Sequence, residues 1–155
     1  KHHTMTKEQT IARLQYYVTN LSAQSMQHRL EGKIFAAQGF SKLGEKYAEH
    51  ADEEMGWVDK MIGRILDLGA TPALEQGPAM PVCTKITDLL AMDRQISVAG
   101  IDILRKDTVA AGDDYVTFDI FKAYLLDEEE DLAWTEQQIA LIETIGLQNW
   151  LTKQL

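Results

Sequence analysis

The sequence predicts an all-α protein: a four-helix bundle with a long crossover between the second and third helices, and a short fifth helix at the C-terminus. Three observations carry this prediction. Apolar residues recur at three- and four-residue steps through most of the 155 residues. All three prolines fall between positions 72 and 81. Glycines stand at positions 39, 69, 112 and 146, where the apolar patterns break off, as is typical of helix ends.

The helix boundaries follow from local signals. Thr6-Lys7-Glu8-Gln9 has the pattern of a capping box, with Thr6 as the N-cap of the first helix. Thr84 is the candidate N-cap of the third helix, and the turn at 112–114 also caps the fourth. The expected helices are, in order, residues 7–38, 41–68, 84–111, 115–145 and 147–154.

The links between the helices predict their directions. The links at Gly39 and at Gly112 are short, which makes the helices they join antiparallel neighbours. The middle link, residues 70–83, can reach about 45 Å, the length of a helix of about 30 residues. The second and third helices can therefore run parallel; a compact loop on an up-and-down bundle is the alternative. Residues 6–155 form one domain, and residues 1–5 are expected to be a tag remnant or disordered.

Composition narrows the class of function. Apolar residues are 45% and charged residues 25%, typical of a folded globular protein. Fifteen Lys and Arg against 24 Asp and Glu give a formal charge of −9, which argues against nucleic acid or an anionic membrane as partner and suits the handling of cations. The single Cys83 excludes an intramolecular disulfide. No transmembrane run or signal peptide is recognisable, so a cytoplasmic protein is expected.

Polar residues on the apolar stripes indicate a metal site. Glu54 interrupts the stripe of the second helix, Glu128 and Asp131 that of the fourth, and His28 that of the first. Buried carboxylates are costly unless they bind something. Carboxylates with an imidazole suit iron, manganese or zinc. We therefore predict metal ligation by His28, Glu54, Glu128 and Asp131; a solvated acidic face is the alternative for residues 127–131.

Two further polar positions accompany this set. Asp93 and Ser97 lie on the inward stripe of the third helix and are expected nearby. His50 is one turn before Glu53 and Glu54, a spacing that could form a surface metal clip. We expect His50 to be an ordinary exposed or dimer-facing side chain instead.

Several segments resemble the bacterioferritins, members of the ferritin-like superfamily. The matching stretches are 51–57 (ADEEMGW), 126–129 (LDEE) with Trp134, and the C-terminal run 146–151 (GLQNWL). The resemblance extends from about Leu14 to the end. It implies a ferritin-like bundle, and a homo-oligomeric shell of about 24 subunits that oxidises Fe(II) and stores Fe(III).

The family's ligands transfer to this sequence only in part. Its two bridging glutamates match Glu54 and Glu128, and its haem methionine matches Met55, with Met26 expected nearby. The resemblance thus implies iron and haem b as cofactors, although methionine is also a common core filler. The other four di-iron ligand positions hold Leu21, Trp57, Ser97 and Asp131.

Two functions are compatible with this mixed pattern. The first is an iron-storage shell subunit with an altered or weakened ferroxidase site. The alternative is a non-catalytic structural or haem-binding subunit that assembles with an active ferritin partner; Leu21, Trp57 and Ser97 favour it.

Overall fold

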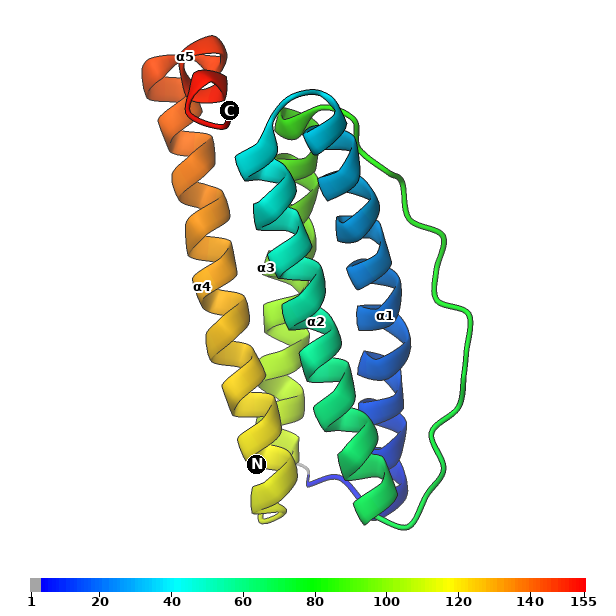
Figure 1. Cartoon of the computed structure of the whole chain (residues 1–155). Helices are drawn as coiled ribbons and strands as arrows, with labels where there is room; N and C mark the ends of the chain where they lie inside the picture. Colours follow the sequence, from blue (N-terminus) through cyan, green and yellow to red (C-terminus); the bar gives the residue numbers. More distant parts are fainter. Residues whose placement is uncertain (1–3) are drawn as a thin grey trace.

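A computed structural model describes residues 4–155. This part of the chain contains helices and no strand: α1 (Lys7–Ala37), α2 (Ser41–Asp67), α3 (Ile86–Ala110), α4 (Tyr115–Ile145) and α5 (Leu147–Thr152). The first four are long and lie side by side, and α5 sits at the end of α4 (Figure 1). α1 packs chiefly on α2, and α3 on α4. The predicted fold class is confirmed.

The crossover between α2 and α3 runs the length of α1 (Figure 1). Side chains of α1 hold it there: Gln15 bonds both the N–H and the carbonyl of Ala73, at 2.7 and 3.0 Å. Further along, Gln27 Nε2 donates to the carbonyl of Pro81 at 3.1 Å. The long link therefore joins opposite ends of the bundle, α2 and α3 run parallel, and the compact-loop alternative is wrong.

The predicted helix ends are largely confirmed. Thr6 accepts from the backbone of Gln9 and Gln9 bonds back, so the capping box is present. The glycines at 39, 69, 112 and 146 all have positive φ, which favours glycine where a helix must turn away. The prediction for Thr84 is wrong: α3 is preceded by Lys85, which makes no side-chain capping bond.

The core has two apolar clusters with a polar layer between them. One cluster includes Leu14, Leu21, Met61 and Phe121, and the other lies toward α5 around Trp150. Along α1 and α2, the polar layer falls where the stripe passes from one cluster to the other. Burial of apolar side chains at both ends fixes the four long helices around this layer.

The N-terminal segment is described in part. Residues 1–3 lie outside the described residues. Met5 donates its backbone N–H to the carbonyl of Ala110 at 2.8 Å, at the base of the bundle. Within residues 4–155, we find no helix whose length and apolar content would let it span a membrane.

Candidate metal centre

A histidine held between two carboxylates occupies the polar layer. His28 of α1 donates from Nδ1 to Glu54 Oε1 of α2 at 2.7 Å. From Nε2 it donates to the carboxylate of Asp93 on α3, at 3.1 and 3.2 Å from the two oxygens. All three side chains are largely shielded from solvent. The ring therefore bridges three helices.

This arrangement makes His28 a buried cation. Burial opposes its protonation, but the hydrogen bonds to Asp93 and Glu54 and the two negative charges outweigh burial and raise the pKa of His28 well above 6.5. Burial also raises the pKa of Glu54, against the opposing effect of His28. With both nitrogens donating to carboxylates, the imidazolium has no lone pair for a metal.

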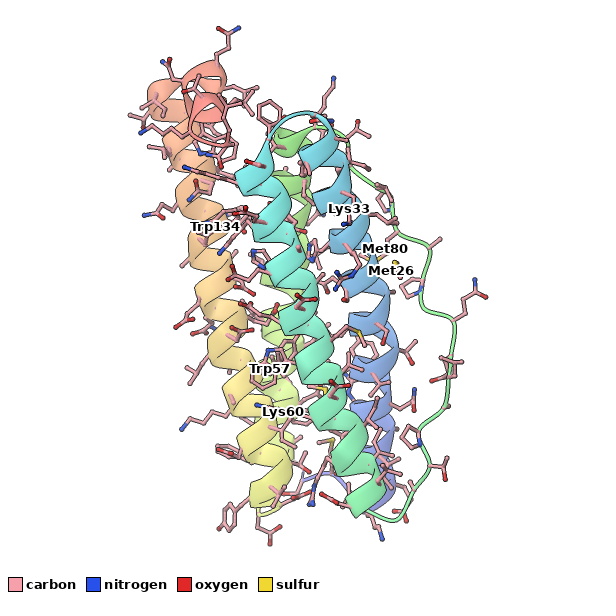
Figure 2. The ribbon with its side chains drawn as sticks, in the orientation of Figure 1. Met26, Lys33, Trp57, Lys60, Met80 and Trp134 are labelled. Carbon is pink, nitrogen blue, oxygen red and sulfur yellow. The ribbon has the colours of Figure 1, made fainter. Side chains whose placement is uncertain are left out.

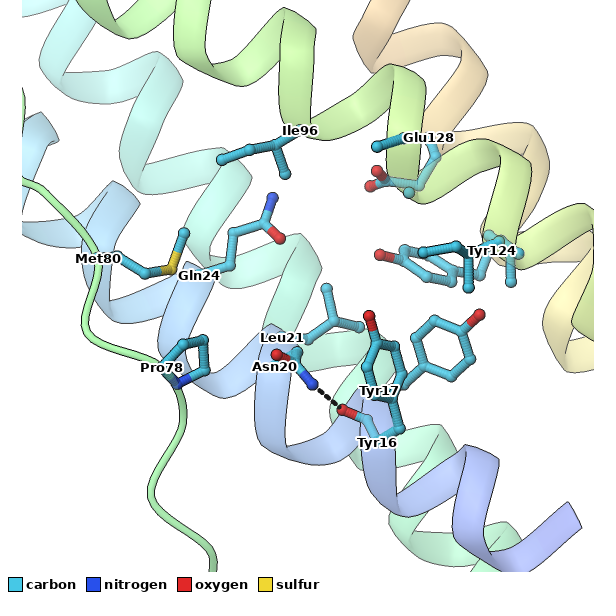
Figure 3. A pocket seen from close by; sticks show the side chains of 14 residues that line it. Tyr16, Tyr17, Asn20, Leu21, Gln24, Pro78, Met80, Ile96, Tyr124 and Glu128 are labelled. Carbon is cyan, nitrogen blue, oxygen red and sulfur yellow. Dashed lines mark hydrogen bonds between the residues drawn. The ribbon is translucent and has the colours of Figure 1, made fainter. Parts of the chain in front are cut away.

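Glu128 of α4 lies at the end of a pocket beneath the crossover. The pocket has a volume of about 310 Å³ and is mostly apolar, with Tyr16, Met80 and Ile96 among its walls (Figure 3). Burial, followed by the negative charges of Asp131 and Glu54, raises the pKa of Glu128 to about 8. At neutral pH this carboxyl group is therefore mainly protonated.

Asp131 joins a different group of residues. Among residues 4–155, one set of three His, Cys, Asp or Glu side chains brings its ligand atoms within 4.8 Å of one another: His50, Glu53 and Asp131. His50 Nδ1 lies 3.8 Å from Asp131 Oδ2. Burial, then the positive charges of His28 and Lys46, lowers the pKa of His50 to about 3, so its ring is neutral.

The expectation that His50 is exposed is wrong, because the side chain is buried within the bundle. A sequence signal for this existed. His50 follows Tyr47 by three residues and precedes Glu54 by four, and both of these lie on the buried stripe of α2. Its ring packs between those of Tyr47 and Trp134, whose centroids are 5.5 and 5.7 Å away.

Trp57 and Leu21 occupy two of the changed positions. Trp57 lies between α2 and α4 (Figure 2), where its Nε1 donates to Asp127 at 2.8 Å and its ring packs 5.5 Å from that of Tyr124. Leu21 is fully part of the apolar core. Both side chains fill space with carbon rather than offering oxygen or nitrogen toward the interior.

The two methionines lie on the outside of the helix pair α1–α2. Met55 is 37% exposed and Met26 is 56% exposed, and the exposed Leu30 is one turn beyond Met26. Figure 2 shows Met26 on the side of α1 that faces the crossover residue Met80. Met55 as a haem ligand stays a prediction.

The predicted ligand set is thus divided. His28 and Glu54 come together with Asp93, which was expected only as a neighbour, whereas Asp131 turns toward His50 and Glu53. Glu128 lines the pocket, and the negative charges of Asp131 from one group and Glu54 from the other both act on it.

The helix order, the long parallel crossover and a carboxylate–histidine layer inside the bundle define the ferritin-like class of protein. A family model described as a ferritin-like domain matches residues 11–145. The chain is 35% identical over 132 residues to the bacterial ferritin of Neisseria meningitidis serogroup B, covering 83% of this chain and 85% of that one. It is 30% identical over 152 residues to the bacterial ferritin of Synechocystis, covering 96% and 97%. It is 29% identical over 122 residues to the bacterioferritin of Streptomyces coelicolor, covering 77% of this chain and 73% of that one. The chain belongs to the bacterial ferritin family.

Proposed function

We propose that this protein is an iron-storage shell subunit of the bacterioferritin kind, with an altered intrasubunit metal site. The observation that carries the proposal is His28 between Glu54 and Asp93. In this layer an imidazolium supplies the positive charge that two buried carboxylates require. Fe(II) is the substrate and Fe(III) the stored product, and the acidic chain, with a formal charge of −9, attracts the cation.

A standard pair of irons does not fit the residues present. Two metal ions need a ring of oxygen and nitrogen ligands. Leu21 and Trp57 offer no such atom to the interior, and Trp57 is already bonded to Asp127. These residues therefore do not form a standard di-iron centre.

The predicted set His28, Glu54, Glu128 and Asp131 accommodates a metal ion only after rearrangement. His28 must lose a proton and give up one of its two carboxylate partners. Asp131 must turn from His50, whose Nδ1 lies 3.8 Å away. We therefore propose that metal binding at this set is weak and that intrasubunit ferroxidase activity is correspondingly low.

Gel filtration and iron loading test the storage function. A shell of about 24 chains of 17.5 kDa elutes at about 420 kDa. Repeated additions of Fe(II) in air should leave a ferric mineral that comigrates with the shell. A monomeric or dimeric elution, or iron that precipitates outside the protein as it does in buffer, contradicts storage.

A gain-of-function variant tests the altered site. Leu21→Glu, Trp57→His, Ser97→Glu and Asp131→His together restore the changed ligands, with Leu21→Glu and Ser97→Glu alone as the control. When two Fe(II) ions are added per chain, the variant with all four substitutions should oxidise iron with a rapid first phase. Both the two-substitution control and the natural protein should lack this phase. A rapid phase in the natural protein, lost on Glu54→Gln, contradicts the proposal.

A second candidate is a non-catalytic structural or haem-binding subunit that assembles with an active ferritin chain. The exposed Met26 and Met55 favour it, since soft sulfur atoms on an outer helix face suit haem iron at a subunit interface. Haem titration of the natural protein and of Met55→Leu tests this: a Soret band that Met55→Leu abolishes and Met5→Leu retains supports it. The absence of haem uptake by the natural protein contradicts its haem-binding form.

A further inference from the structure

His50 is a buried histidine without a hydrogen bond. Its side chain is 9% exposed, and among residues 4–155 its buried Nε2 has no hydrogen-bond partner. Buried polar groups in folded proteins nearly always have one. The nitrogen that faces other polar atoms is Nδ1, which looks toward Asp131 at 3.8 Å, too far for a hydrogen bond.

Two carboxylates complete a set with the His50 ring. Glu53 follows His50 by three residues on α2, so the two side chains share a face, and Asp131 reaches them from α4. The three ligand atoms lie within 4.8 Å of one another. With metal–ligand bonds of about 2.1 Å, neighbouring ligand atoms on an octahedral or tetrahedral ion are about 3.0–3.4 Å apart. The three side chains therefore have to close by less than about 2 Å to surround a single ion.

The two carboxylates have no positive partner of their own. Among the described residues, no Lys or Arg nitrogen lies within 4.0 Å of Glu53 or Asp131. The nearby ammonium of Lys46 lies over the ring of Trp134, 4.8 Å from its centroid. The negative charge of Asp127 on α4 acts on the pKa of both carboxylates more strongly than the positive charge of Lys46 does.

The charges around the three side chains suit a bound cation. Burial, then the negative charges of Asp127, Glu53 and Glu54, raises the pKa of Asp131 to about 7. A neutral imidazole beside ionisable carboxylates is the protonation state that metal ligands require.

We propose that His50, Glu53 and Asp131 form a binding site for one divalent first-row transition-metal ion between α2 and α4. One imidazole nitrogen and two carboxylates suit Fe(II), Mn(II), Co(II) and Zn(II), with water completing the coordination. The site is separate from the His28–Glu54–Asp93 group. It goes beyond the proposed storage function, since it concerns equilibrium binding of a single ion and not mineral deposition.

Cobalt(II) binding to the assembled, metal-free protein tests the proposal, because cobalt reports its ligands through visible absorption. We expect one Co(II) per chain with a band that Zn(II) displaces. Glu53→Gln and Asp131→Asn should each weaken binding at least tenfold. Glu45→Gln on α2 and Glu130→Gln on α4 remove one exposed charge each and are the matched controls, with affinity expected within twofold of the natural protein.

The proposal is overturned by no Co(II) binding to the natural protein, by undiminished affinity of Asp131→Asn, or by equal weakening by Glu130→Gln. Loss of the ion on Glu54→Gln, with Glu53→Gln unaffected, also overturns it by assigning the ion to the His28 group. Circular dichroism of each variant checks that the fold persists. A shell that stores mineral yet binds no Co(II) here contradicts this site alone, whereas tight Co(II) binding without mineral contradicts only the storage function.

Discussion

His28 Nδ1 lies 2.7 Å from Glu54 Oε1, with both side chains buried at the level where the two apolar clusters of the bundle meet. Asp93 accepts a hydrogen bond from the other ring nitrogen of His28. One protonated imidazole therefore balances the charge of two carboxylates that come from two other helices. The chain itself therefore supplies the positive charge that balances these two buried carboxylates.

Removal of this cation should be strongly destabilising. His28→Leu leaves Glu54 and Asp93 buried without a positive partner, a loss that typically costs about 3–5 kcal/mol. Adding Glu54→Gln in the same chain should recover at least about 1 kcal/mol of the free energy of unfolding, because the two residues interact directly. Urea denaturation at pH 7 measures both. Additive costs of the two substitutions would show that the pair is not coupled.

The close contact of α1 and α2 depends on a glycine. A Cβ at Gly44 would lie 2.9 Å from Ala36 Cβ and 3.1 Å from the carbonyl oxygen of Gly32. Gly44→Ala should therefore destabilise the bundle by about 1–2 kcal/mol, even though alanine favours helix by up to about 1 kcal/mol.

Gly63→Ala on the same helix is the matched control. A Cβ there meets nothing within 4 Å, so this substitution should raise the melting temperature slightly. Calorimetry compares the two variants. A higher melting temperature for Gly44→Ala than for the natural protein would mean that the helices separate without cost.

Asp114 should make stability depend on pH at the start of α4. It accepts from the Thr117 N–H and pairs with Arg64 at 2.7 Å. Burial opposes its ionisation, but the bonds from Thr117 and the charge of Arg64 prevail and hold the pKa of Asp114 below 3.8. Its ionised form therefore stabilises the fold above pH 3.8, and this contribution is lost as the pH falls through the lowered pKa.

Asp114→Asn isolates this effect, because asparagine also caps helices well. We expect a loss of about 1 kcal/mol at pH 7, since the pair is partly exposed, and a smaller difference from the natural protein at pH 3. Asp113→Asn, which removes an adjacent exposed charge, should match the natural protein at both values. A difference that grows on acidification would reverse the sign and contradict the assignment.

The sequence was sufficient for the fold because its signals are local. The capping box at Thr6 and the glycines with positive φ each act within a few residues, and the proline-rich link only has to be long enough to follow α1. The prediction of Thr84 as the N-cap of α3 was wrong because a capping threonine and a loop threonine look alike in the sequence. Only the backbone geometry shows that Lys85 is the N-cap.

The sequence predicted which layer of the bundle holds the candidate site, but not which of its residues contact one another. Helical periodicity placed His28 and Glu54 inside the bundle, and both lie there. Periodicity does not say which inward residues meet across helices, because this depends on helix rotation and packing. Asp93 as the second partner of His28, and the turn of Asp131 toward His50, required the three-dimensional structure.

The most direct measurement is anomalous diffraction at the iron absorption edge from crystals soaked anaerobically in Fe(II). We expect a single peak among His50, Glu53 and Asp131, with His28 still bonded to Glu54 and Asp93. A pair of peaks bridged by Glu54 and Glu128, with His28 turned away from Glu54, would contradict it.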